Sequence, residues 1–106
     1  MEKKSILFVD DEQKILSGLK RSLHKNREVW HMDFASSGKA ALETMSNREF
    51  DVVVSDIRMP EMDGIRLLEE VKKHYPKAVR IVLSGYAEIE KENKAVLVAH
   101  QYLSKP

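Results

Sequence analysis

Hydrophobic residues along the chain follow two alternating patterns. Continuous apolar runs, such as 6–9 and 52–54, predict strands buried on both faces, because half-exposed strands alternate apolar with polar residues. Between these runs, as in 12–25, apolar residues recur at the three- and four-residue spacing of amphipathic helices. The predicted strands cover 5–9, 29–35, 50–55, 78–83 and 101–104. The predicted helices cover 12–25, a segment that begins at 36–38, 65–75 and 87–96.

Strands that alternate with helices predict βαβ units around a parallel sheet. Right-handed crossovers then favour a doubly wound α/β sandwich with helices on both faces. Only Lys105 and Pro106 follow the last predicted strand, so we expect one face of the sheet to be partly bare and the intact protein to continue. A bare apolar face would also favour a homodimer.

The composition narrows the class of protein. A chain of 106 residues with 42% hydrophobic content is expected to form one domain with a single core. Lysine and arginine number 18 against 17 acidic residues, and no basic run suggests nucleic-acid binding. The absence of cysteine excludes disulfides and thiolate metal sites and suits a reducing cytosol. The apolar run at 6–9 is too short for a signal peptide or a membrane span, so we expect a cytoplasmic protein without a membrane partner.

Acidic residues follow two of the predicted buried strands. Asp10 and Asp11 come directly after the first strand, and Asp56 follows the third. Ligands of open α/β sheets bind at the carboxyl ends of the strands, and neighbouring strands lie about 4.8 Å apart. Three carboxylates crowded there would favour a cation, and oxygen ligands without His or Cys select Mg²⁺. Taken singly, Asp10 and Asp11 would be interpreted as the N-cap and first turn of a helix.

Two more polar residues follow apolar strands. Ser84 ends the strand 78–83, and Lys105 follows 101–104, so both are expected at the edge where Asp56 lies. A hydroxyl and an ammonium that face a metal-bound carboxylate suit the binding of a phosphoryl group. Separately, Ser84 would be interpreted as a turn residue and Lys105 as a surface lysine held extended by the following proline.

In this order and spacing the motifs resemble the receiver domain of response regulators from bacterial two-component systems. The matching segments are Phe-Val-Asp-Asp-Glu at 8–12, Asp-Ile-Arg-Met-Pro at 56–60, Met-Asp-Gly at 62–64, Ser-Gly at 84–85 and Lys-Pro at 105–106. The resemblance covers the chain except for the family's fifth helix. It implies a flavodoxin-like sheet of five parallel strands in the order 2-1-3-4-5, with four helices.

The resemblance also implies a role for each acidic residue. Asp56 would be the phosphoacceptor, which attacks a phosphohistidine on a sensor histidine kinase to form an acyl phosphate. Asp11, Asp56 and the backbone carbonyl of Arg58 would hold Mg²⁺, and Asp10 would act mostly through water. The domain would catalyse only its own phosphorylation and dephosphorylation, by positioning and charge neutralisation.

The remaining matched residues would sense the phosphoryl group. Lys105 would pair with its oxygens and Ser84 would move to bond one of them, while Tyr102 would turn inward as a switch. This change on the 84–105 face would control an output domain beyond residue 106 or a separate effector protein. Arg58 and Tyr86 lie two residues after Asp56 and Ser84, and we hypothesise that they shield the acyl phosphate from water and prolong its lifetime.

Two other functions remain open. One is a receiver-like module that binds proteins without being phosphorylated. The other is a Mg²⁺-dependent phosphohydrolase with an Asp nucleophile, of the haloacid-dehalogenase type. That type requires acids two residues apart after the first strand, whereas Glu12 occupies the position two after Asp10, and the chain is too short for a cap domain.

Overall fold

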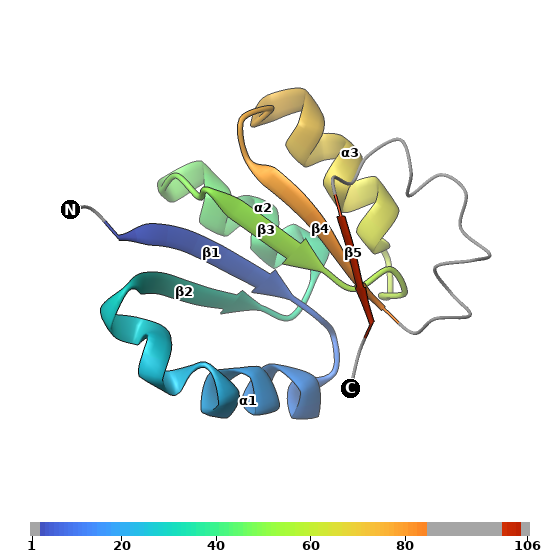
Figure 1. Cartoon of the computed structure of the whole chain (residues 1–106). Coiled ribbons are helices and arrows are strands. Elements are labelled where there is room, and N and C mark those ends of the chain that lie inside the picture. The colour runs from blue at the N-terminus through green and yellow to red at the C-terminus, as the bar shows by residue number, and fades with distance from the viewer. Residues whose placement is uncertain (1–2, 85–100, 105–106) are drawn as a thin grey trace.

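The computed structural model of the protein describes residues 3–84 and 101–104. Strands and helices alternate along the chain (Figure 1). The strands are β1 (Lys4–Val9), β2 (Trp30–Ala35), β3 (Val52–Ser55), β4 (Val79–Ser84) and β5 (Gln101–Ser104). The helices are α1 (Gln13–Ser22), the 3-10 helix η1 (His24–Glu28), α2 (Gly38–Asn47) and α3 (Gly64–His74).

The five strands form one parallel sheet in the order β2-β1-β3-β4-β5, which confirms the predicted topology. Val9 is the register partner of Ser55, Ser55 that of Val82, and Ser84 that of Ser104. The carboxyl ends of β1, β3, β4 and β5 therefore lie at one edge of the sheet. The strands β1 and β3 occupy the centre, and their side chains are buried on both faces, as the continuous apolar runs predict.

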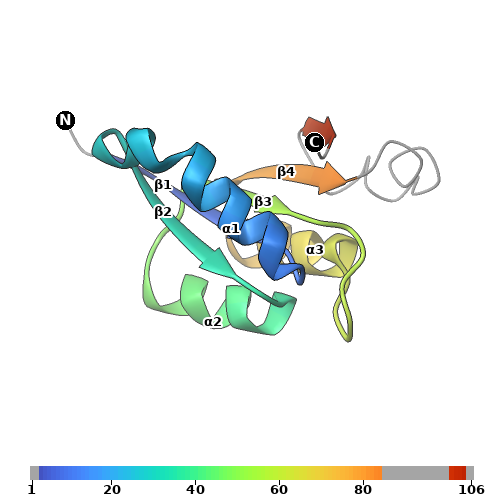
Figure 2. The same cartoon turned by 90° about the horizontal axis from the view of Figure 1, so that it is seen from below.

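Helices cover both faces of the sheet. In Figure 2, α1 lies on one face, and α2 and α3 lie on the other. Alternate residues of each strand contribute to the two cores: Leu7 and Val53 pack on the α2–α3 side, whereas Phe8 and Val54 pack on the α1 side with Leu16. The α1 face is less completely covered over β4, where Val79 is 41% exposed.

The first helix ends about one turn earlier than the sequence predicted. A helix over 12–25 was expected, but α1 ends at Ser22 with Leu23 as its C-cap, and the chain continues as η1. Leu23 packs against the α1-side core, and its carbonyl accepts from the Asn26 N–H. This three-residue spacing is the hydrogen-bond pattern of a 3-10 helix, which leads the chain to the edge strand β2. Val29 was assigned to the second strand, but it caps η1 and is 57% exposed.

Other element boundaries agree more closely with the sequence. The hydroxyl of Ser37 accepts from the Ala40 N–H and caps α2, as the polar segment 36–38 suggested. The helix α3 ends at His74, before Pro76, as expected. The predicted helix 87–96 lies outside the described residues. Among residues 3–84 and 101–104, no helix combines the length and apolar character needed to span a membrane.

A buried cation lies near the amino ends of the strands, whereas the acidic residues lie at their carboxyl ends. Arg80 on β4 is 7% exposed, and its Nη1 donates to the carbonyl of Ala78 at 3.1 Å and to that of Pro76 at 3.4 Å. Burial lowers the pKa of the Arg80 guanidinium, which stays charged at neutral pH. Its bonds secure the turn between α3 and β4.

Candidate functional site

Three carboxylates meet at the carboxyl ends of β1 and β3. One oxygen of each of Asp10, Asp11 and Asp56 lies within 4.8 Å of the others. Asp10 is 1% exposed and Asp56 is 3% exposed, whereas Asp11 is exposed to solvent. The cluster that the strand ends predict is therefore present, with two members buried and one open.

The backbone holds Asp10 in place through both neighbouring elements. Its N–H donates to the carbonyl of Ala35 on β2 at 3.1 Å, and its Oδ1 accepts from the N–H of Glu12 at 2.9 Å. The N-cap of α1 is Glu12, and the first turn of that helix contains no acid. Asp10 and Asp11 thus precede the helix, and the interpretation of these acids as its cap and first turn is wrong.

Asp56 is fixed in a similar way at the end of β3. Its N–H donates to the carbonyl of Val9 on β1 at 2.9 Å, and its Oδ1 accepts from the Ile57 N–H at 2.9 Å. The buried hydroxyl of Ser55 donates to the Asp56 carbonyl at 2.9 Å. These short bonds orient the carboxylate toward the end of β1.

The loop after Asp56 turns sharply before α3 begins. Glu61 has a φ of 67°, and the Met62 N–H donates to the Pro60 carbonyl at 2.7 Å, which is the bonding pattern of a γ-turn. The start of α3 then meets the chain just after β3, where the Gly64 N–H donates to the Ile57 carbonyl at 2.7 Å. The first turn of α3 therefore lies directly against the backbone that follows Asp56.

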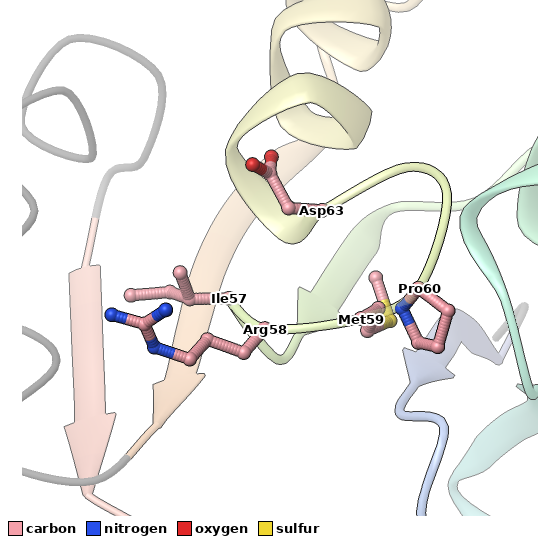
Figure 3. Close-up of a pocket in the computed structure, with 5 residues that line it drawn as sticks. All are labelled: Ile57, Arg58, Met59, Pro60 and Asp63. Carbon is pink, nitrogen blue, oxygen red and sulfur yellow. The ribbon is translucent and has the colours of Figure 1, made fainter.

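A cavity of about 420 Å³ opens within this loop. Figure 3 shows its five lining residues: Ile57, Arg58, Met59, Pro60 and Asp63. The side chains of Ile57 and Arg58 extend toward the side of β4, whereas Met59 and Pro60 lie on the opposite side of the loop. Ile57 is buried and anchors the loop, whereas Arg58 is exposed at its surface.

The electrostatics of the cluster favour a divalent cation. Two like unit charges about 4 Å apart repel by about 1 kcal/mol in water and about 4 kcal/mol at an effective dielectric of 20. Asp10 and Asp56 are buried, so their carboxylates lie closer to the second condition than to the first. Oxygen ligands of this kind match the preference of Mg²⁺, and the donor set therefore fits that ion.

The other predicted site residues are described only in part. The backbone of Ser84 ends β4 beside Ser104, and Tyr102 on β5 is the register partner of Val82. Lys105 and Tyr86 lie outside the described residues. The carboxyl ends of β4 and β5 thus lie at the same edge of the sheet as Asp56.

Two supporting residues were not recognised from the sequence. Ser55 was counted only as the end of a strand, although its hydroxyl bonds to the Asp56 carbonyl. The predicted helix 65–75 left out Gly64, but Asp63 is the N-cap of α3 and Gly64 its first residue. A Cβ atom on Gly64 would lie 1.8 Å from the Asp56 carbonyl oxygen, so this position requires glycine. The Met-Asp-Gly segment at 62–64 was the feature of the sequence that could have identified this position.

Curated proteins similar to this chain include regulators and a kinase. The regulatory protein AtoC of Escherichia coli K12 is 37% identical over 102 residues, which cover 95% of this chain and 22% of AtoC. The sensor kinase CckA of Brucella abortus is 44% identical over 86 residues, 79% of this chain and 9% of the kinase. The chain thus spans about a fifth or less of the length of these relatives.

Solved structures share the fold at similar identity. The signal receiver domain of an HD domain-containing protein from Pseudomonas fluorescens Pf-5 has a TM-score of 0.91 and 33% identity, with 100% of this chain and 78% of that chain covered. The response regulator protein TrrA from Thermotoga maritima, solved in complex with Mg(2+)-BeF, has a TM-score of 0.85 and 32% identity, with coverage of 97% and 87%. The family model of the response regulator receiver domain matches residues 6–106. The chain therefore belongs to the response regulator receiver domain family, whose members act in two-component signalling.

Proposed function

We propose that Asp56 accepts a phosphoryl group from a phosphohistidine of a sensor histidine kinase. A carboxylate oxygen of Asp56 forms the new O–P bond as the N–P bond breaks, and the departing imidazole keeps the electron pair of that bond. The product is an acyl phosphate on this chain. The observation that carries the proposal is the cluster of three carboxylates, whose oxygens lie within 4.8 Å of one another and which includes the buried Asp56.

Asp10, Asp11 and Asp56 are the residues that would hold Mg²⁺, together with the backbone carbonyl of Arg58. Asp11 is exposed and Asp10 is buried, which suits direct binding by Asp11 and binding through water by Asp10. When bound, the ion would neutralise charge on the carboxylates and on the incoming phosphoryl oxygens. The backbone bonds to Asp10 and Asp56 keep both carboxylates oriented before the phosphoryl group arrives.

Ser84 and Lys105 complete the proposed site. The register of Ser84 with Ser104 supports this placement, because Lys105 is the next residue along the chain. Lys105 would bind the phosphoryl oxygens as a cation, and the Ser84 hydroxyl would donate a hydrogen bond to one of them. Both residues act only after the acceptor carboxylate has been positioned.

Tyr102 would act as the aromatic switch that turns inward when Asp56 is phosphorylated and Ser84 moves. Phosphorylation adds charge at the strand ends and favours one arrangement of the 84–105 face. We infer that an output domain beyond residue 106, or a separate effector protein, binds that arrangement. We infer that residues 1–106 form a receiver domain that acts in the cytoplasm; they span about a fifth of the length of regulators such as AtoC.

Arg58 and Tyr86 would set the lifetime of the acyl phosphate. Arg58 is exposed beside the loop cavity, from which its side chain can cover the phosphoryl group and exclude in-line water (Figure 3). Alanine at both positions should speed the loss of the phosphoryl group. Decay at the rate of the unmodified protein would contradict this role.

The decisive experiment measures intact mass after incubation with acetyl phosphate, with and without Mg²⁺. We expect a Mg²⁺-dependent gain of one phosphoryl group that Asp56→Asn abolishes. Asp51→Asn is the matched control, because Asp51 is exposed at the opposite end of the same strand, and its Oδ2 accepts from the Ser5 N–H. Phosphorylation of the Asp56→Asn variant, or loss of phosphorylation in the control, would refute the assignment.

The mass measurement also separates this proposal from a receiver-like module that only binds proteins, and a metal-binding measurement tests the Mg²⁺ site. Asp11→Asn should weaken Mg²⁺ binding, yet it should raise the stability of the metal-free protein because it removes one of three like charges. A phosphohydrolase would instead release inorganic phosphate repeatedly. One equivalent of phosphoryl group per chain, followed by slow decay, would exclude that activity.

The apolar face over β4 supports one further proposal about assembly. Val79 is 41% exposed on this face, and Ile81 and Leu83 are half-buried. We infer that a second copy could cover it and form a homodimer. Sedimentation of the protein over a range of concentrations, with Val79→Lys as the variant that should weaken association, tests this proposal.

A further inference from the structure

A groove of about 390 Å³ runs beside β2, away from the carboxylate cluster. On one side it is lined by Lys20 of α1 and by His24 and Arg27 of η1. Its floor is formed by Trp30, Met32 and Phe34 of β2, and His31 completes the lining. The strand β2 lies at the outer edge of the sheet, next to α1 (Figure 1). The groove therefore combines a sheet edge with apolar and basic side chains.

The backbone of β2 offers hydrogen bonds along this groove. Within the described part of the chain, β2 pairs with β1 alone. The carbonyl of Ala35 faces β1, because it accepts from the Asp10 N–H. Backbone groups alternate in direction along a strand, so those of Trp30, Met32 and Phe34 face outward. The same three residues supply the floor of the groove.

The charge of the groove has one sign. Within residues 3–84 and 101–104, no acidic residue lines it, whereas Lys20 and Arg27 contribute two cations. Lys20 Nζ lies 5.0 Å from the centre of the Phe34 ring, and Arg27 Nη1 donates to the His24 carbonyl at 3.0 Å. Both cations are thereby held at the walls by uncharged partners, so their charge is available to an anionic ligand.

We propose that this groove binds an extended acidic segment of a partner protein, which adds to β2 as a further strand. The outward backbone groups supply main-chain hydrogen bonds, and every second side chain of the segment faces the groove. Among these groove-facing side chains, apolar ones pack on Trp30 and Met32, and acidic ones pair with Lys20 and Arg27. A second copy of this chain is a poorer occupant, because it would place these cations opposite their own counterparts. This surface is separate from Asp56, so the inference does not depend on the proposed function.

Trp30 provides a direct signal, because it is the only tryptophan of the chain. The probe is a blocked eight-residue peptide in which every second residue is in turn glutamate and leucine and the residues between are threonine, titrated while the Trp30 fluorescence is recorded. We expect a saturable change that weakens as salt increases. A peptide with lysine in place of each glutamate should bind at least tenfold more weakly. Methylation of the backbone nitrogens on one edge of the acidic peptide should also cost at least tenfold, because it removes the donors to β2.

Charge-reversed variants locate the binding site. Lys20→Glu with Arg27→Glu should weaken the acidic peptide at least tenfold. The matched control is Lys14→Glu with Lys25→Glu, which changes the net charge equally at exposed positions outside the groove and should alter binding less than threefold. Circular dichroism melting verifies that both variants fold.

A proline variant tests the backbone contribution. Met32→Pro removes an outward N–H and leaves the bonds to β1 in place, so it should abolish strand addition. Met32→Ala loses the same side chain but keeps the N–H, and it should retain most of the affinity. Equal binding by these two variants would overturn the proposal.

Other outcomes would also overturn it. These are equal binding of the acidic and lysine peptides, equal binding of the methylated peptide, and equal weakening by the control charge reversal. Tighter binding of a single-stranded oligonucleotide would assign the groove to nucleic acid. A dimer that the acidic peptide does not dissociate, but that Met32→Pro does, would assign it to a second copy.

Discussion

Gly64 fixes the distance between α3 and the backbone of Asp56, and Gly64→Ala tests this packing. A Cβ atom there would lie 1.8 Å from the Asp56 carbonyl oxygen, 2.7 Å from the Asp56 carbonyl carbon and 2.9 Å from the Ile57 Cα. All three contacts involve backbone, which cannot move aside as a flexible side chain can. The helix or the end of β3 must therefore shift by more than about 1 Å to reach ordinary contact distances.

The expected cost of Gly64→Ala follows from two opposing effects. Overpacking costs typically 1–3 kcal/mol, and a backbone clash belongs near the upper end, about 3 kcal/mol. The better helix propensity of alanine returns up to about 1 kcal/mol. We expect a net loss of about 2 kcal/mol in the free energy of unfolding, or a melting temperature about 10 °C lower. Because a displacement of about 1 Å can cost about 100-fold in rate, phosphorylation by acetyl phosphate should fall by a similar factor.

Urea denaturation followed by circular dichroism gives the stability, and intact mass against time gives the phosphorylation rate. The control is Gly18→Ala in α1, where a Cβ atom would meet nothing within 4 Å. That variant should gain about 0.5–1 kcal/mol and keep the rate of the unmodified protein. A Gly64→Ala protein that is as stable and as rapidly phosphorylated as the parent would refute the reasoning.

Three further predictions concern stability and are measured by urea denaturation. Glu61 has a φ of 67°, so Glu61→Gly should stabilise the protein by about 1 kcal/mol; a loss of stability would mean that the side chain has a compensating role. The Asp63 carboxylate caps α3 by accepting from a backbone N–H, so Asp63→Ala should cost about 1 kcal/mol, whereas Asp63→Asn should cost much less. Asp33 and Arg48 form an ion pair at 2.9 Å with side chains 37% and 43% exposed, so a double-mutant cycle should give a coupling below about 0.5 kcal/mol that decreases in high salt. A coupling above about 1 kcal/mol would contradict that estimate.

Much of the fold follows from local patterns in the sequence. The apolar runs at 6–9 and 52–54 predict the two central strands, because only residues buried on both faces can be apolar without interruption. Ser37 and Pro76 mark the start of α2 and the end of α3 through capping and the steric demand of proline. The end of α1 was misplaced because apolar periodicity continues to Leu23, although its side chain packs from the C-cap and not from the helix.

Part of the candidate site also follows from the sequence, and part does not. Strand-end positions predict that Asp10, Asp11 and Asp56 come together, because parallel strands end at a common edge. Strand-end position alone did not predict the bond from Ser55, which depends on the conformation of that side chain, or the close approach of Gly64, which depends on how α3 packs against the backbone after β3.

The sequence by itself determined which segments are strands or helices and which acidic residues follow the strands. These properties depend on hydrophobic period and on turn chemistry, which act over a few neighbouring residues. The tertiary structure alone decided which acids are buried, why the first residue of α3 must be glycine, and how the edge of β2 becomes a basic groove. Those features arise between separate elements, where packing distances of a few ångströms fix contacts that no local pattern encodes.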